Sequence, residues 1–233
     1  MFLEQEQDAT VWLAALALFA GQHEPYLAPL LALGASHASA EVRKQSLEWF
    51  ITHPNPAYGD LLTNSLLDDH VAVIHAALRA LAALPELPNP RAIEELLAAR
   101  DPAIRLAAAY ALAAHGISPG YAALLRLAYH EEPLIRRQVA LTLGELGDIR
   151  SIQELIRLLD DRPEVQLAGL AALKMLLGQD ISQDPNIQAR AGISPRPAGV
   201  TGNASLTCAE QCRCWKTWHQ QHQARSARQA EVR

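Results

Sequence analysis

The sequence has few aromatic residues, few cysteines and no hydrophobic run long enough to span a membrane. Phe, Trp and Tyr make up 5% of the 233 residues, although hydrophobic residues of all kinds make up 50%. A core built from Leu and Ala instead of aromatic rings favours closely packed helices. The 3 cysteines, an odd number near the C-terminal end, give no disulfide framework. With 19% charged residues, the chain is neither disordered nor a multispan membrane protein.

Basic charge is also scarce over most of the chain. Residues 1–177 carry 13 Lys and Arg against 21 Asp and Glu, whereas residues 178–233 carry 7 against 4. An acidic body lacks the clustered Lys and Arg that neutralise phosphates, which argues against nucleic-acid binding. The uncharged segment 9–20 follows an acidic stretch, the wrong sign for a signal peptide, and is too short to span a bilayer. We therefore expect a cytoplasmic protein that binds neither nucleic acid nor membranes.

An internal repeat organises most of the chain. The segment Asp101-Pro102-Ala103-Ile104-Arg105 is followed by a run of alanines, and similar segments begin at residues 8, 39, 70, 132 and 162. The starts are 31 residues apart, and 30 at the last step. Each unit predicts two helices, because apolar residues recur at three- and four-residue steps until Gly or Pro interrupts them. One such unit cannot bury its apolar stripe alone, whereas stacked units can.

This pattern resembles HEAT repeats, in particular the short HEAT-like subclass of the phycobilisome lyase subunits, and many such proteins are bacterial. The resemblance depends on the Asp-x-x-(Val/Ile)-Arg corner, the alanine column and a Leu-Gly-x-x-Gly-Asp exit at residues 143–148. It implies an all-α, right-handed α-solenoid of about six stacked antiparallel helix pairs over residues 1–177. Residues 178–206, with three prolines and little apolar content, predict a flexible linker. A capping box at Thr207 and Glu210 predicts a C-terminal helix within residues 207–233.

We find no motif for catalysis or metal binding. His75 falls in the column where HEAT-repeat deoxyhypusine hydroxylases carry iron-binding His-Glu pairs, but Ala76 follows it. No Gly-rich phosphate loop and no Ser/His/Asp motif is present in the sequence. We expect no metal, no cofactor and no catalytic residue, which favours a non-catalytic protein over an enzyme. The C-terminal helix contains possible zinc ligands, but not at the spacing of a standard site: Cys208, Cys212, Cys214, His219 and His222.

Three arginines occupy one column of the repeat, four residues after the start of their units. They are Arg43, Arg105 and Arg136. In a stacked array each can reach an acidic group at the neighbouring corner, and such partly exposed pairs contribute roughly 0.5–1 kcal/mol each. We therefore assign this column a structural role.

The terminal segments carry apolar helices that could bind a partner. Between Asp8 and Glu24 no residue is charged, so the first helix is apolar on every side. Residues 1–3 and the second unit cover it, or it binds another protein or a second copy of the chain, or the sequence is part of a longer protein. The C-terminal helix either caps the sixth unit or binds a partner. The candidate interface residues are Val11, Trp12, Leu16, Phe19, Trp215 and Trp218.

These observations favour a non-catalytic scaffold or adaptor that binds another protein through the solenoid face or its apolar terminal helices. The alternative is a subunit of a lyase or maturation factor, as in the bilin lyase subunits that this repeat subclass resembles. Bilin chemistry needs a pocket with His, Asp or Tyr side chains. The sequence offers only scattered candidates for such a pocket, namely Tyr110, His115, Tyr121 and Tyr129.

Overall fold

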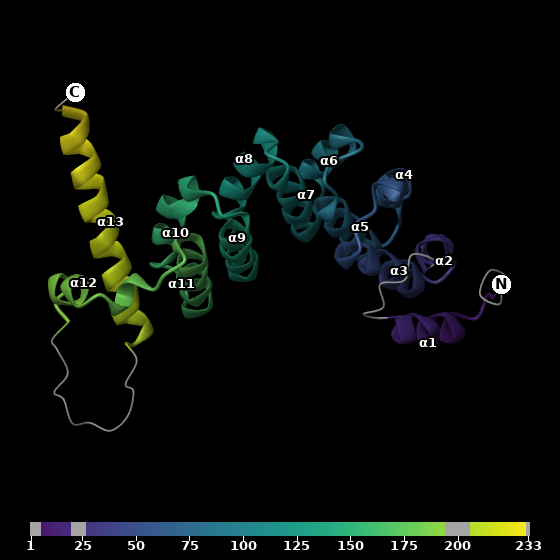
Figure 1. Cartoon of the computed structure of the whole chain (residues 1–233), viewed down its shortest axis with the longest axis horizontal. Coiled ribbons are helices and arrows are strands. Elements are labelled where there is room, and N and C mark those ends of the chain that lie inside the picture. Colours follow the sequence, from purple (N-terminus) through teal and green to yellow (C-terminus); the bar gives the residue numbers. More distant parts are fainter. Residues whose placement is uncertain (1–5, 20–26, 194–205, 232–233) are drawn as a thin grey trace, which may run out of the picture. The chain divides into compact units, whose positions relative to one another are not determined.

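The computed structural model describes residues 6–19, 27–193 and 206–231, and within these ranges every regular element is a helix (Figure 1). The predicted all-α class is therefore confirmed. The chain divides into two compact units, Met1–Leu124 and Leu125–Arg233, which we describe separately. None of the helices in the described ranges has the length and apolar character needed to span a membrane.

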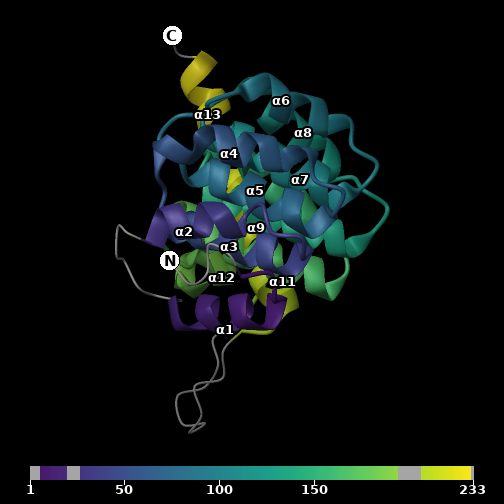
Figure 2. The ribbon, with the colours of Figure 1, turned by 90° about the vertical axis from the view of Figure 1, so that its right-hand side faces the viewer.

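The first unit consists of long helices that pack side by side in chain order, each followed by a shorter helix. The shorter helices α4 and α6 form a second layer against α5 and α7 (Figures 1 and 2). The long helices are α1 (Ala9–Phe19), α3 (Ala40–Thr52), α5 (Val71–Ala83) and α7 (Pro102–Ala114). The shorter ones are α2 (Leu27–Gly34), α4 (Gly59–Asn64) and α6 (Pro90–Glu95), with 3-10 turns η2 (Pro56–Tyr58), η3 (Ser65–Leu67) and η4 (Leu96–Ala98).

The second unit has the same construction and ends in a long helix. Helix α8 (Ser118–Leu127) spans the boundary between the units, and α9 (Pro133–Leu146) packs against α11 (Pro163–Leu177). The last helix, α13 (Cys208–Glu231), lies against α10 (Ile152–Leu158) and α11. The remaining elements are η5 (Ile149–Ser151), η6 (Ile181–Gln183) and α12 (Pro185–Arg190).

Every long helix of the six repeats begins directly after a residue that starts a predicted unit. At α7 the start is stabilised by Asp101, whose carboxylate accepts a hydrogen bond from the backbone N–H of Ala103 at 2.7 Å. Proline fills the first position of α7, α9 and α11, where a missing N–H leaves no hydrogen bond unmade. The six starts are Asp8, Ser39, His70, Asp101, Glu132 and Arg162.

Small residues allow neighbouring long helices to approach each other closely. A Cβ atom added to Gly144 of α9 would lie 2.7 Å from the Cα atom of Ala172 in α11. At the ends of these two helices, Gly147 and Gly178 adopt left-handed conformations with φ of 67° and 64°. Such conformations are strained for any residue with a Cβ, which is why glycine ends both helices.

The structure differs from the predicted linker where Ile181–Gln183 form η6 and Pro185–Arg190 form α12. Asp184 caps α12 and Pro185 fills its first position, so the segment begins with the same Asp-Pro corner as α7. Ile187 is buried together with Cys214 of α13, which fixes this short helix against the last one. Of the predicted linker, residues 194–205 lie outside the described residues.

Candidate interaction surface

Helix α1 places its apolar residues in two different environments. Asp8 caps it by accepting hydrogen bonds from the backbone N–H and the hydroxyl of Thr10, and these bonds lower the pKa of the carboxyl group. Trp12 and Leu16 point inward and are only 2% and 7% exposed. Val11 and Leu18 point outward and are 42% and 72% exposed. The candidate interface residues of α1 therefore include both buried and exposed positions. The most exposed apolar residue of the helix, Leu18, is not among them.

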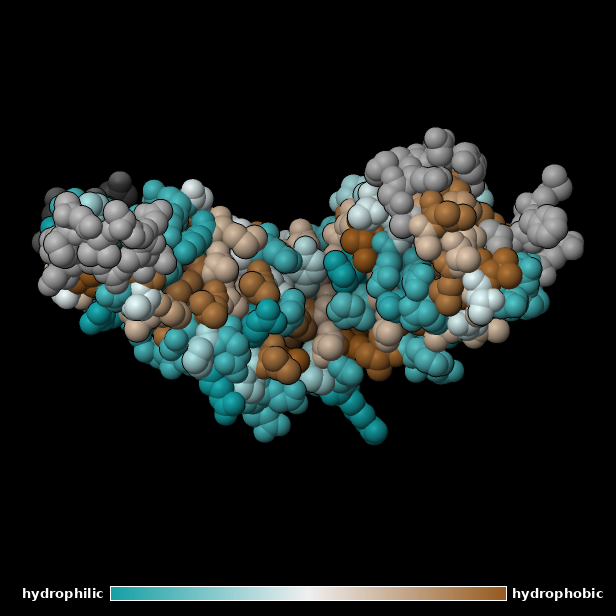
Figure 3. All heavy atoms as spheres, turned by 90° about the horizontal axis from the view of Figure 1, so that it is seen from below, coloured by the Kyte–Doolittle hydropathy of each residue, from teal (hydrophilic) through white to brown (hydrophobic). Residues whose placement is uncertain are grey.

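A groove of about 320 Å³ lies between α1 and α3. One wall is apolar and comes from α1, whereas the α3 wall combines an aromatic ring with polar side chains. Hydrophobic residues gather at this end of the first unit (Figure 3). The lining residues are Leu16, Ala17, Phe19, Gln45, Glu48, Trp49 and Thr52. Two candidate interface residues, Leu16 and Phe19, therefore border an open groove.

Trp49 is the largest of the lining residues that the sequence did not single out. It is half-buried, and its ring stacks on His53 at a centroid distance of 3.9 Å and an interplanar angle of 7°. The repeat register could have identified it, because Trp49 stands ten residues after a unit start, as Leu18 does. The same position therefore carries a large apolar side chain in the first two repeats.

Two members of the arginine column form paired contacts with aspartate. The Nε and Nη2 atoms of Arg43 donate to the two carboxylate oxygens of Asp68 at 2.6 and 2.9 Å. Arg136 makes the same contact with Asp161 at 2.6 and 2.7 Å. The arginine hydrogen bond holds the pKa of each carboxyl below its usual value. Each aspartate also accepts a backbone N–H at the residue that precedes the next long helix, so the pair stands at the corner between two repeats.

Arg105 has the same anchorage without the carboxylate. Its Nη1 atom donates to the carbonyl oxygens of Ala99 and Arg100 at 2.9 and 2.8 Å, as Arg43 and Arg136 do at their own corners. Among the described residues no carboxylate lies within ion-pair distance of Arg105. Both paired arginines precede their aspartate by 25 residues, and the residue 25 positions after Arg105 is His130.

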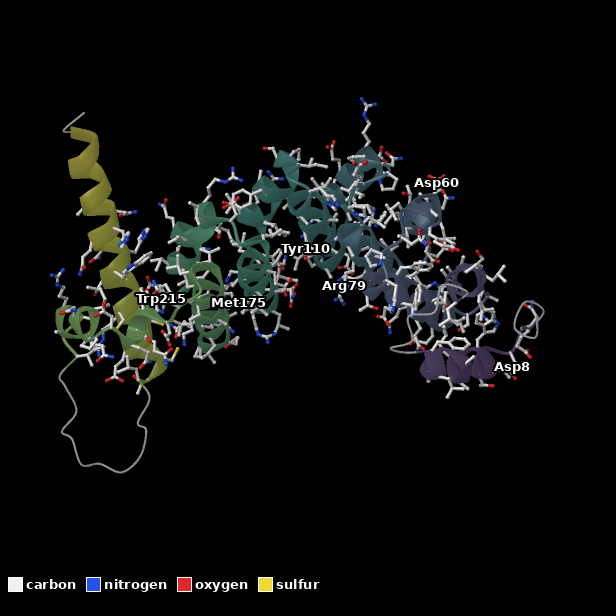
Figure 4. The ribbon with its side chains drawn as sticks, viewed as in Figure 1. Asp8, Asp60, Arg79, Tyr110, Met175 and Trp215 are labelled. Carbon is white, nitrogen blue, oxygen red and sulfur yellow. The ribbon has the colours of Figure 1, made fainter. Side chains whose placement is uncertain are left out.

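The tryptophans of the C-terminal helix face the interior of the second unit. Trp215 is completely buried where α13 meets the preceding helices (Figure 4), and Trp218 packs edge-on against it at 5.9 Å. Lys216 forms an ion pair with Asp160, just after α10, which adds a polar contact at the same junction. Trp215 is therefore part of the core, whereas Trp218 is partly exposed.

The titratable residues noted in the sequence lie in different parts of the chain, and among the cysteines Cys208 and Cys212 contact each other. Burial raises the pKa of the Cys212 thiol to about 12, which disfavours the thiolate that a metal or a nucleophilic reaction needs. Burial lowers the pKa of His75. Both ring nitrogens of His115 lie 2.8 Å from carbonyl oxygens, and Tyr129 donates to Glu154 at 3.2 Å. In the described part of the chain no three His, Cys, Asp or Glu side chains lie close enough to hold a metal ion.

Comparison with known families supports the repeat architecture. Residues 89–174 match the family described as HEAT repeats, which covers the chain from just before α6 into α11. This part of the chain is therefore similar to HEAT repeats. The match does not distinguish the phycobilisome lyase subclass. A search of curated proteins found no match.

Proposed function

We propose that this chain is a non-catalytic cytoplasmic adaptor that binds another protein through the exposed face of α1 and the groove beside it. The observation that carries the proposal is the exposure of Val11 and Leu18 on a helix without a single charged residue. Large apolar side chains that stand together at a surface mark interaction sites more often than isolated ones do. The groove between α1 and α3 adds Trp49, an aromatic residue of the kind enriched at binding hot spots.

Affinity capture from native lysate tests the proposal when it uses variants that leave the fold intact. Leu18→Asp places a charge in the exposed face, and we expect it to abolish capture of the partner. Leu67→Asp is the matched control, because Leu67 is 85% exposed in the same unit and lies outside α1. Substitution of Trp12 would be uninformative, since its side chain is buried and its indole N–H donates to the carbonyl oxygen of Glu6. Equal capture by wild type and Leu18→Asp would contradict the proposed site.

A further inference from the structure

The exposed face of α1 corresponds to a surface that later repeats use to contact their neighbours. Val11, Ala14 and Leu18 stand three, six and ten residues after the unit start at residue 8. The residues at the same offsets in α11 are Val165, Ala168 and Ala172, which are 0%, 5% and 0% exposed. In α5 they are Val73, Ala76 and Ala80, which are 0%, 2% and 0% exposed. The positions left open on α1 are therefore filled contact positions in α5 and α11.

The identity of that contact is visible at α11. Ala172, the counterpart of Leu18, lies so close to the preceding long helix α9 that a Cβ on Gly144 would approach its Cα to 2.7 Å. The side of α1 that carries Leu18 therefore corresponds to the side of α11 against which the preceding long helix packs. An α-helix laid along α1 would continue the contact that the chain already makes internally.

Among the described residues near α1, the charges without an ion-pair partner are acidic. Asp8 and Glu48 are exposed, Glu6 is partly exposed, and among the described residues no Lys or Arg forms an ion pair with any of them. Glu41 is different, since Lys44 and Gln45 already donate hydrogen bonds to it. The first unit as a whole carries 6 Lys and Arg against 13 Asp and Glu. A basic partner would gain attraction here, whereas a second copy would bring another acidic unit against the first.

From the stacking positions and the charge we infer that the partner contributes an amphipathic α-helix whose apolar stripe is bordered by Lys and Arg. This inference rests on the proposed function and specifies the chemistry of its partner. The apolar stripe of the partner helix covers Val11, Ala14 and Leu18. Its basic border lies near Glu48 at the groove and near the acidic residues that precede α1.

Two synthetic peptides test the inference by fluorescence anisotropy with the full chain. Both are 18-residue amphipathic helices with the same leucine face, and their polar face is all lysine in one and all glutamate in the other. We expect the lysine peptide to bind at least tenfold more tightly than the glutamate peptide. Leu18→Asp should weaken binding of the lysine peptide at least tenfold, although it makes the protein more acidic, and Leu67→Asp should leave it unchanged. Glu48→Lys should weaken the lysine peptide and strengthen the glutamate peptide.

Each other outcome overturns the inference in a distinct way. Undiminished binding of the lysine peptide to Leu18→Asp would mean general electrostatic adsorption, because an added negative charge cannot weaken that. Equal affinity for both peptides, lost in Leu18→Asp, would contradict the basic border and leave the proposed function intact. Binding of neither peptide at 100 µM would contradict a helical partner. A dimer in sedimentation experiments that Leu18→Asp dissociates would identify a second copy as the occupant.

Discussion

The two terminal helices each bury a tryptophan and differ in what covers the rest of their surface. Helix α13 lies against α10 and α11 and buries Trp215 completely. Helix α1 buries Trp12 and Leu16 but leaves Val11 and Leu18 exposed on its other side. A buried tryptophan alone therefore does not distinguish a cap from an interface. The distinction depends on which side of the helix a neighbouring element covers, and that can be tested at both ends.

The largest effect should come from removing the buried tryptophan of the C-terminal helix. Trp215→Ala leaves a cavity between α13 and the helices beneath it, and we expect a loss of about 3–5 kcal/mol in the free energy of unfolding. Urea denaturation followed by circular dichroism measures it. Trp218→Ala is the control and should cost less, because Trp218 is partly exposed. A loss below about 1 kcal/mol for Trp215→Ala would mean that α13 is not a cap.

Each unit contains one arginine–aspartate pair, and these pairs should contribute equally to stability although the terminal helices of the units differ. Arg43→Ala and Arg136→Ala each remove a two-point contact with a largely buried aspartate, so both should cost about 1.5–3 kcal/mol. Arg105→Ala removes only two bonds to carbonyl oxygens and should cost about 1 kcal/mol. Melting temperatures of the three variants, measured side by side, give the order. A loss for Arg105→Ala equal to the other two would contradict the role of the aspartates.

Acid should destabilise each unit through the aspartate of its arginine pair, Asp68 in the first unit and Asp161 in the second. Because Arg43 and Arg136 hold the pKa of Asp68 and of Asp161 below the usual value of 3.8, both pairs stabilise the fold fully above about pH 4. That stability is lost as the pH falls through the lowered pKa values. Thermal unfolding from pH 6 to pH 2.5 measures the decline. Asp161→Asn should be less stable at pH 6 and should decline less steeply, and an unchanged slope in this variant would refute the assignment.

The smallest effect should come from the open face of α1. Leu18→Asp changes a 72% exposed side chain, so the free energy of unfolding should change by no more than about 0.5 kcal/mol. Urea denaturation under the conditions used for Trp215→Ala provides the comparison. A loss of several kcal/mol would show that Leu18 is covered within the chain, and the contrast between the two ends would disappear.

Periodicity predicted the fold well, because every repeat starts its long helix with the same local chemistry. The six unit starts precede six long helices, and the capping box at Thr207 and Glu210 is present, with the Thr207 N–H donating to Glu210 at 2.7 Å. Helix α12 was missed although Asp184-Pro185 repeats the Asp101-Pro102 corner. It is too short to show a helical period, so only its cap could have revealed it.

The candidate surface was harder to predict, because exposure depends on contacts between elements distant in sequence. Composition marked α1 as apolar on every side, yet which side α3 covers follows only from packing. Trp12 and Leu18 are equally plausible in sequence and have opposite environments. The repeat register provides the missing step, since the offset of Leu18 is that of Ala172, whose neighbour in space is known.

The 25-residue separation of the arginine pairs has a consequence for how such repeats can be exchanged. Arg43 and Asp68 both fall within residues 39–69, and Arg136 and Asp161 both fall within residues 132–161. Each of these repeats therefore contains both members of its ion pair. Trp12 and His37, also 25 residues apart, place their rings 5.9 Å from each other within residues 8–38. A gene segment cut at the corner before a long helix transfers such a pair whole, whereas a cut between the two helices divides it. The corner before a long helix is therefore the boundary at which a repeat can be duplicated, deleted or grafted without dividing its pair.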